Sequence, residues 1–559
     1  MKRDQLKRFV GNADGAVAAI YAIALIPLVA IIGLAYDYTR LVGLDTELQN
    51  AADQAALAGA SQLDRTSGSM ERAIAAIQGG LVSNSTLFSN DGEGTNIDVN
   101  AIDICFYSSK PDAEAGDPST CFTDVTRFAE AGFVQVTVEQ RAAEYAFTPV
   151  VGAIADDLIA SAVAGMGSSL CRIPPLMVCN PDETDRGSGG NPNSTFDIAT
   201  RRGTGVRVVA GPTGSGPSYW EPGNFGFLDL GAGASAVAEG LGWLTSLDNC
   251  IAIEGNETIA PDTEPGLKAG AIDSINTRFD IYQNNSTCKS PGQCPAAFNS
   301  RKDLIREAQD TPASSTNACA ISSSGWKESA ATKYLPSSVA PLPSTTTPYS
   351  MGHPRDICHA VSAGGTCTGG RFGDGIWDRD AYFRSHYVRT STGRNGEAIG
   401  TSWTQADWEY NLTHGTDALT TSTPTRYEVY EWEVKREGDL VDGVVVLDPH
   451  PVGATGATEL KQATPICSQH NGYAGDMKTP DRRVMTVAIV NCTAEGVRGK
   501  TSDVQIADWI DVFLVQPSAD RGRTSKADIY FEVIRKTDVS RTGAPSGPLV
   551  RRDVPYLVR

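Results

Sequence analysis

The densest group of side chains that could do chemistry lies between residues 353 and 380. Its members are His353, Asp356, Cys358, His359, Cys367, Asp374, Asp378 and Asp380. Imidazole, thiolate and carboxylate groups bind transition metals, and aspartate oxygens also suit calcium. The spacing matches no standard site, because an EF-hand loop needs oxygen ligands at positions 1, 3 and 5 and a distant glutamate. We therefore assign no metal ligand from the sequence.

Motifs for catalysis and cofactor binding are also missing from the sequence. It has six histidines, but no Gly-x-Ser-x-Gly elbow and no H-E-x-x-H pair. The glycine-rich runs Gly211–Gly216 and Gly231–Gly233 do not match the phosphate-loop pattern G-x-x-x-x-G-K-[ST]. We assign no catalytic residue and no cofactor, and expect a non-enzymatic protein. The alternative is a metal-dependent envelope hydrolase built around His353, His359 and the nearby aspartates.

Charge and cysteine content restrict the partners and the compartment. The 559 residues carry a net charge of −19, so no basic surface is available for nucleic acid. All twelve cysteines lie between Cys105 and Cys492, which favours disulfides in an exported region. Neighbours in the sequence suggest the couples Cys105/Cys121, Cys171/Cys179, Cys288/Cys294, Cys358/Cys367 and Cys467/Cys492, although sequence alone leaves the connectivity open.

One element near the N-terminus can anchor the chain in a membrane. Residues 16–36 contain no charged side chain and are long enough to cross the hydrocarbon core as a helix. Four cations lie in the basic stretch 1–15, and only Arg40 follows the span closely. The positive-inside rule then predicts a cytoplasmic N-terminus and a periplasmic body, with one pass through the inner membrane. A cleaved signal peptide, the alternative, would have a shorter apolar region.

The apolar span is predicted to continue into a second helical stretch. Residues 37–63 contain no proline and repeat apolar or small residues every three or four positions. This face consists of Leu41, Leu44, Leu48, Ala52, Ala55 and Gly59. Such a face belongs either to a core helix of the first exported domain or to a seam between molecules. We favour the core helix, and the two interpretations are compatible.

These N-terminal motifs together resemble a known family. The stretches Asp14–Ala18, Gly33–Asp37 and Leu48–Ala60 are similar to the N-terminal region of TadG-like proteins of the tight-adherence (Flp) pilus assembly machinery. Weaker similarities occur at residues 171–181, 222–228, 276–280 and 373–378. Many TadG-type proteins also carry a von Willebrand A-like domain, whose metal loop reads Asp-x-Ser-x-Ser. The nearest pattern here begins at Asp229 and lacks both hydroxyls, so metal-dependent adhesion is not expected.

The rest of the chain is predicted to alternate between packed and loop-rich regions. We predict a helix from Ser69 to Leu81 with Ser69 as its cap, strands at 96–106 and 133–139, and a helical or mixed segment at 150–164. Residues 180–222 are rich in turn formers and predict an exposed loop. Five further strands are predicted at 425–434, 442–447, 483–490, 509–515 and 528–534. Trp403, Trp408 and Trp432 could bind carbohydrate, but Trp432 in the first of these strands is more simply a core residue.

These elements give the fold class α+β. A single transmembrane helix at 16–36 continues into a pilin-like α+β domain at 37–168. A β-rich, disulfide-containing exported region follows. It divides into a loop-rich part at 169–310, a low-complexity linker or loop at 311–350 and a β-rich C-terminal domain at 351–559.

The resemblance implies a function in pilus assembly or secretion through protein–protein contacts in the periplasm. The expected partners are the inner membrane and other Tad/Flp pilus assembly proteins or pilins, with neither nucleic acid nor a small-molecule substrate. Besides the hydrolase, the remaining alternative is an adhesin that reaches outward.

Overall fold

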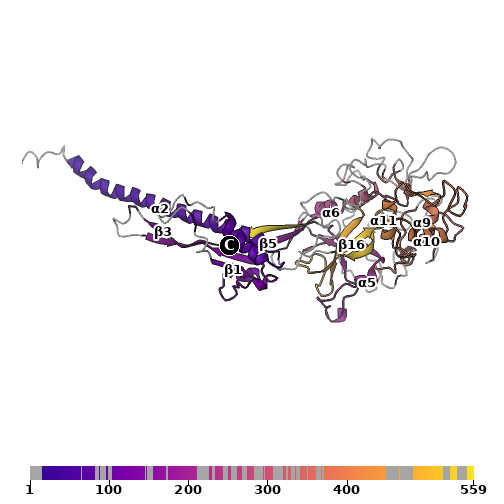
Figure 1. The fold of residues 1–559 in the computed structure, drawn as a ribbon, viewed down its shortest axis with the longest axis horizontal. Coiled ribbons are helices and arrows are strands. Elements are labelled where there is room, and N and C mark those ends of the chain that lie inside the picture. Colours follow the sequence, from indigo (N-terminus) through magenta and orange to yellow (C-terminus); the bar gives the residue numbers. More distant parts are fainter. Residues whose placement is uncertain are drawn as a thin grey trace, which may run out of the picture. The chain divides into compact units, whose positions relative to one another are not determined.

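The fold was analysed in a computed structural model. It describes residues 16–64, 66–81, 87, 96–97, 103–144, 146–147, 155–171, 174–209, 226–229, 233–242, 250–253, 261–266, 273–282, 294, 296–305, 319–322, 325–328, 334, 340–348, 351–360, 367, 371–447, 465, 482–519, 529–537 and 550–558. The chain divides into two compact units (Figure 1). The first comprises residues 1–168, 253–257 and 553–559, and the second comprises residues 169–252 and 258–552.

The first unit begins with one long helix, α2, which covers Ala16–Ala60. Alanine and leucine, the strongest helix formers, dominate its sequence, and Pro27 lies within it without ending it. Its 45 residues correspond to a length of roughly 68 Å at 1.5 Å per residue. The prediction that the apolar span continues into the alanine-rich stretch without a break is confirmed.

An antiparallel sheet packs against the C-terminal half of α2. It contains β1 (Asp103–Tyr107), β2 (Phe133–Thr137) and β5 (Ser161–Cys171), with β18 (Val550–Leu557) beside β5. In Figure 1 the yellow C-terminal strand accordingly lies next to β5. The strand β9 (Cys250–Ile253) also pairs with β5. The first sheet is therefore completed by residues nearly 400 positions later in the sequence, since β5 and β18 are neighbours.

The smaller elements of the first unit surround this sheet. They are α3 (Ser69–Ala76), the π-helical turn η2 (Ile77–Leu81), α4 (Lys110–Ala115), η5 (Val125–Arg127) and the hairpin of β3 (Arg141–Glu144) with β4 (Ala155–Leu158). The predicted helix from Ser69 to Leu81 is present, but its cap is Gly68, and Ser69 is the first helical residue. The helical or mixed prediction for 150–164 is wrong where the structure describes it, because β4 and the start of β5 are strands.

A second five-stranded sheet forms the centre of the second unit, in the order β6-β15-β16-β17-β7. The strands are β6 (Met177–Cys179), β7 (Gly205–Val209), β15 (Val484–Val490), β16 (Ile506–Leu514) and β17 (Ile529–Lys536). Every residue of β15 is buried, as expected for a strand covered on both faces. The strands predicted at 483–490, 509–515 and 528–534 are confirmed as β15, β16 and β17.

Each face of this sheet carries its own apolar core. One core holds Val487 and Ile489 of β15 together with residues of α6 (Gly233–Gly242) and η8 (Asp273–Phe279). The other holds Phe513 and residues of three helices, α9 (Arg379–His386), α10 (Gln405–Thr413) and α11 (Arg426–Lys435). Short elements complete the second unit: η7 (Arg186–Ser188), α5 (Ile198–Arg201), β8 (Phe227–Leu228), β10 (Thr263–Glu264), β11 (Leu304–Ile305), β12 (Lys327–Glu328), α8 (Ile357–Ala360), β13 (Leu440–Val441) and β14 (Val444–Val445).

The strand predicted at 425–434 is wrong, because this segment is the helix α11. Its aromatic and β-branched residues alternate with polar ones, which is typical of a strand. A capping box overrides that preference: Thr425 Oγ1 accepts from Glu428 N, and Glu428 Oε2 accepts from Thr425 N at 2.8 Å. Trp432 is a core residue as predicted, but it lies on a helix. The strand predicted at 442–447 is the short β13–β14 hairpin.

Two segments predicted as loops contribute buried structure. Within 180–222, the residues Gly205–Val209 form β7 at one edge of the second sheet, so the exposed-loop prediction is wrong there. Residues 210–222 lie outside the described part. Within 311–350, Trp326 is buried and donates its Nε1 proton to Asp280 O at 2.7 Å. Segments rich in turn-forming residues therefore contain short runs that pack into a core.

Three disulfides are defined in the described part of the chain. Cys105–Cys121 and Cys358–Cys367 confirm two of the suggested couples. Cys179 bonds to Cys492, which makes the couples Cys171/Cys179 and Cys467/Cys492 wrong. The cause is topological: β6 and β15 are parallel neighbours, so their C-terminal ends meet. The couple Cys288/Cys294 includes a residue outside the described part.

Candidate functional site

The N-terminal half of α2 has a surface suited to lipid. Its large apolar side chains are exposed from Ile20 to Leu34, among them Ile23, Ile26 and Ile31. Within the described residues, this is the one helix that is long and apolar enough to cross a membrane. Exposed apolar residues over that length are costly in water and favourable in hydrocarbon. The helix is therefore a candidate membrane anchor.

A carboxylate lies just beyond the apolar run. Asp37 is only 2% exposed, although it sits on an otherwise exposed stretch of α2. Its Oδ1 accepts a hydrogen bond from Ala146 N at 2.9 Å, and its Oδ2 accepts one from Phe147 N at 2.8 Å. Two consecutive backbone donors thus surround the charge. The contact fixes the segment after β3 to the helix at the end of the span.

The glycine four residues earlier completes this contact. A Cβ atom on Gly33 would lie 2.6 Å from Phe147 Cβ, so only glycine lets these two segments of the backbone approach this closely. Tyr36 packs edge-to-face on Phe147, with ring centroids 5.5 Å apart. We call Gly33, Tyr36, Asp37, Ala146 and Phe147 the juxtamembrane clasp. It explains the Gly33–Asp37 motif in structural terms.

The C-terminal half of α2 is a core helix, as predicted. Leu44, Leu48, Ala52 and Ala55 are fully buried or nearly so, and they pack on the first sheet. Gly59 allows a very close approach, because a Cβ there would lie 2.6 Å from Ile77 Cδ1. Small residues on this face therefore bring α2 close to its neighbours within the same molecule.

A polar pair on α2 also holds the helix to the sheet. Gln49 Nε2 donates to Asp53 Oδ1 at 2.8 Å and to Ser161 O of β5 at 3.3 Å. Both side chains belong to the Leu48–Ala60 stretch, so that motif includes a tether as well as a packing face.

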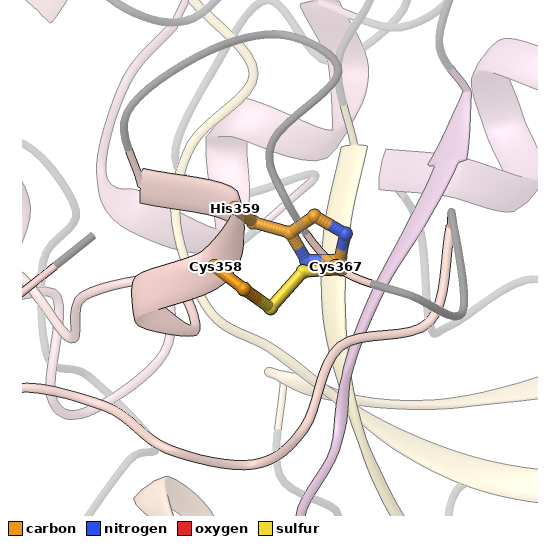
Figure 2. Close-up of side chains that lie close together, drawn as sticks. All are labelled: Cys358, His359 and Cys367. Atoms are coloured by element: carbon orange, nitrogen blue, oxygen red, sulfur yellow. A yellow bond between two sulfur atoms is a disulfide. The ribbon is translucent and has the colours of Figure 1, made fainter. Parts of the chain in front are cut away.

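The polar cluster of the second unit is brought together, but as structural pairs. Cys358, His359 and Cys367 have potential ligand atoms within 4.8 Å of one another. Figure 2 shows that the two cysteines are joined as a disulfide beside the imidazole ring. Disulfide sulfurs are not thiolates, which are the form that binds metals. His359 Nδ1 lies 2.9 Å from the Tyr530 hydroxyl, so that nitrogen already has a hydrogen-bond partner.

Asp356 has the most buried carboxylate of the cluster, and it forms part of an internal ion pair. It pairs with Arg426, which also binds Glu532 at 2.7 Å. The other oxygen of Asp356 accepts from Gly205 N at 2.9 Å and Gly375 N at 2.7 Å. Burial raises the pKa of Glu532, although the positive charge of Arg426 opposes that shift. This group links β7, α11 and β17.

The remaining aspartates of the cluster have separate local tasks. Asp378 caps α9 by accepting from Ala381 N at 3.1 Å, and it also accepts from Leu342 N at 2.7 Å. Asp380 pairs with Arg384 one turn later on the same helix. Asp374 is exposed and accepts from Ile376 N at 3.0 Å. The three side chains therefore stabilise turns and a helix end, rather than forming one oxygen-lined site.

His353 is buried among aromatic and cationic groups. Its ring stacks on Tyr382 with centroids 4.6 Å apart, and its Nδ1 lies 3.3 Å from Arg483 Nη2. Burial and the positive charge of Arg483 hold the pKa of His353 well below its usual value. The ring is therefore neutral at pH 7, and its nitrogen accepts from the guanidinium.

Sequence reasoning missed the buried ionic groups of the second unit. Besides Arg426, a second group joins Arg301 to Glu433 at 2.7 Å, and Glu433 also accepts from the hydroxyls of Tyr382 and Tyr387. These partners are 46 to 132 positions apart, so no spacing pattern relates them. No sequence signal marked Arg426, because the helix that begins after its neighbour Thr425 was itself predicted as a strand.

Comparison with known proteins bears on α2. A family model described as putative Flp pilus-assembly TadE/G-like matches residues 15–62. No curated protein and no solved structure matches the chain. The matched residues coincide with α2, and they include the helical half of the juxtamembrane clasp and the core-packing face. Residues 15–62 are therefore similar to the TadE/G-like segment of Flp pilus-assembly proteins, which is consistent with a TadG-like protein.

Proposed function

We propose that this protein is a single-pass inner-membrane component of Flp pilus assembly. Its two units lie in the periplasm and act by binding other pilus assembly proteins or pilins. The observation that carries the proposal is the coincidence of the family match with α2. One helix supplies both an exposed apolar surface and the packing face of the first unit.

The charge distribution and the cysteines support the periplasmic placement. Lys2, Arg3, Lys7 and Arg8 precede the span, and cations favour the cytoplasmic side. The three defined disulfides all lie after the span, and such bonds persist in oxidising compartments. Both observations favour the same orientation.

A binding role, rather than catalysis, fits the polar cluster around His353. The described acids and histidines of that cluster bind backbone donors, arginines or a tyrosine, and Cys358 is oxidised. Each partner stabilises the fold. We therefore propose that the second unit supplies a rigid body for contacts with partners.

A deletion strain tests the assembly role. In a bacterium that encodes this protein, loss of the gene is expected to abolish Flp pili in electron micrographs and to lower surface adhesion. The wild-type gene in trans should restore both. Normal pili in the deletion strain would contradict the proposal.

Site-specific crosslinking tests the mode of action. A photoreactive amino acid at Val42, which is exposed on α2 beyond the span, is expected to capture an envelope protein of the pilus machinery. Ile399 is also exposed, and it provides a second probe position, on the second unit. Crosslinks to pilus proteins from neither position would contradict action through protein contacts.

A further inference from the structure

The juxtamembrane clasp places a loop of the exported unit at the depth of the membrane span. Phe147 packs at Gly33, which lies three residues before Tyr36, the end of the uncharged run. At 1.5 Å per residue, Gly33 is about 4.5 Å inside that end. A residue that contacts Gly33 therefore reaches the level of the outer lipid headgroups or below it, if α2 spans the membrane as proposed.

The side chain of Phe147 is exposed beside the apolar surface of α2. Its side chain is 51% exposed, although it packs on Gly33 and Tyr36. Tyr36, which packs on this ring, and Leu34, which follows Gly33 on α2, are also exposed. Tryptophan and tyrosine concentrate at membrane interfaces, whereas phenylalanine, which has no polar group, lies on the apolar side of such segments. The exposed part of Phe147 thus continues the apolar surface of the anchor.

Asp37 satisfies two polar backbone groups of the segment that contains Phe147. A backbone segment outside a helix or sheet has polar groups that hydrocarbon cannot satisfy. Here the two N–H groups of Ala146 and Phe147 both donate to the Asp37 carboxylate. In return, the two donors stabilise the charge of Asp37, which is almost fully shielded from solvent. The carboxylate and the two amides therefore satisfy one another.

The sequence around Phe147 has the matching composition. The connection between β3 and β4, residues 145–154, reads YAFTPVVGAI and contains no charged residue. Charges return on both sides, at Glu144 and Asp156. An exported loop that faced water would gain solubility from charged side chains, whereas an uncharged aromatic and aliphatic stretch suits lipid.

We infer that Phe147, held to α2 by Asp37 and Gly33, is a second membrane contact that inserts into the outer leaflet. The occupant of its exposed face is lipid, because that face is continuous with the exposed surface of the proposed anchor. This contact would hold the first unit against the membrane and restrict its rotation about α2. The inference rests on the proposed membrane anchoring of α2.

Tryptophan fluorescence in vesicles tests this contact on the full chain. All eight native tryptophans lie between Trp220 and Trp509, so the first unit has none. A Phe147→Trp variant is reconstituted in phosphatidylcholine vesicles with and without bromine atoms on the acyl chains. The added emission, taken as the difference from wild type, is expected to be blue-shifted and quenched by the brominated lipid.

Two further variants separate the possible failures. Leu25→Trp lies within the span and should be quenched strongly. Ile159→Trp is equally exposed but follows β4 at the other end of the β3–β4 hairpin, and it should be quenched little. If Leu25→Trp is not quenched, the anchor itself is refuted.

If Leu25→Trp is quenched but Phe147→Trp matches Ile159→Trp, the second contact is refuted. A blue-shifted yet unquenched Phe147→Trp would show that protein, such as a second copy, covers this face, and would also overturn the lipid assignment. Adding Asp37→Ala to Phe147→Trp is expected to reduce the quenching, since the loop is then no longer held to the helix.

Discussion

Charged side chains in the core of the second unit depend on their partners. Arg426 lies between Asp356 and Glu532, and all three are fully buried. Removal of one member of such a group leaves a charge without compensation in a region of low dielectric constant. The loss of one member of this group therefore destabilises the fold, although the complete group adds little stability.

The change Arg426→Met tests this requirement. It should lower the free energy of unfolding by about 3–5 kcal/mol, because Asp356 and Glu532 lose their shared cation. Urea unfolding of the full chain measures the loss. Arg202→Met is the matched control, since Arg202 pairs with Glu428 at the surface at 3.0 Å. Exposed pairs contribute about 0–1 kcal/mol, so equal losses in the two variants would contradict the assignment.

His353 makes stability depend on pH in a defined direction. Its pKa in the folded state is lowered below the usual 6.5, mainly by burial. Below pH 6.5 the unfolded chain therefore binds a proton that the folded chain does not, and stability falls as pH falls. The loss can reach about 1.4 kcal/mol for each pH unit.

The change His353→Gln should remove this component between pH 6.5 and 5. Urea unfolding at several pH values would then show a shallower decline than in wild type. His414→Gln, which alters an exposed histidine at the end of α10, is the control for the exchange of a histidine for glutamine. A wild-type slope in His353→Gln would contradict a neutral buried imidazole.

At the scale of elements, sequence periodicity predicted α2 and three strands of the second sheet. Those elements have long, consistent patterns: an uncharged run joined to an alanine-rich face, and strands buried along their length. It failed at α11, where local capping and tertiary burial override the strand preference of Tyr427 and Val429. It also failed at β5, because the alanines of that strand favour a helix and its glycines do not favour a strand.

Thr425 is the residue that decides the start of α11. Thr425→Ala should reduce the free energy of unfolding by about 1 kcal/mol, because one backbone donor of the first turn loses its acceptor. Thr425→Ser retains the hydroxyl and should restore most of the loss. Thermal or urea unfolding distinguishes the two variants. Equal stability of Thr425→Ala and wild type would show that packing alone fixes the helix start.

At the scale of the whole molecule, distant segments complete each sheet. β6 and β7 pair with strands formed from residues 484–536, and β18 pairs with β5 of the first sheet. Long-range pairing of this kind leaves no periodic signal in the sequence, so neither the strand order nor the Cys179–Cys492 bond was predictable. The sequence also left open whether the His353 cluster is structural or binds a metal. Its partners Arg426, Arg483 and Tyr530 are distant in the chain.

The two disulfides defined in the described part of the second unit should differ in their effect on stability. Cys179–Cys492 has a sequence separation of 313, whereas Cys358–Cys367 has one of 9. Because the entropy of an unfolded loop grows with the logarithm of its length, the longer link should contribute about 3 kcal/mol more. Urea unfolding of the double alanine variants of each pair measures the difference. A larger loss for the short loop would contradict this expectation.

Replacement of residues 1–36 by a cleavable signal peptide tests most directly whether α2 must anchor the protein for pilus assembly. The exchange keeps Asp37, the core-packing half of α2 and both units, but releases them from the membrane. In the deletion strain, the released protein should accumulate in the periplasm and fail to restore Flp pili in electron micrographs, while the anchored protein restores them. Wild-type numbers of pili with the released protein would contradict the proposed role of the anchor.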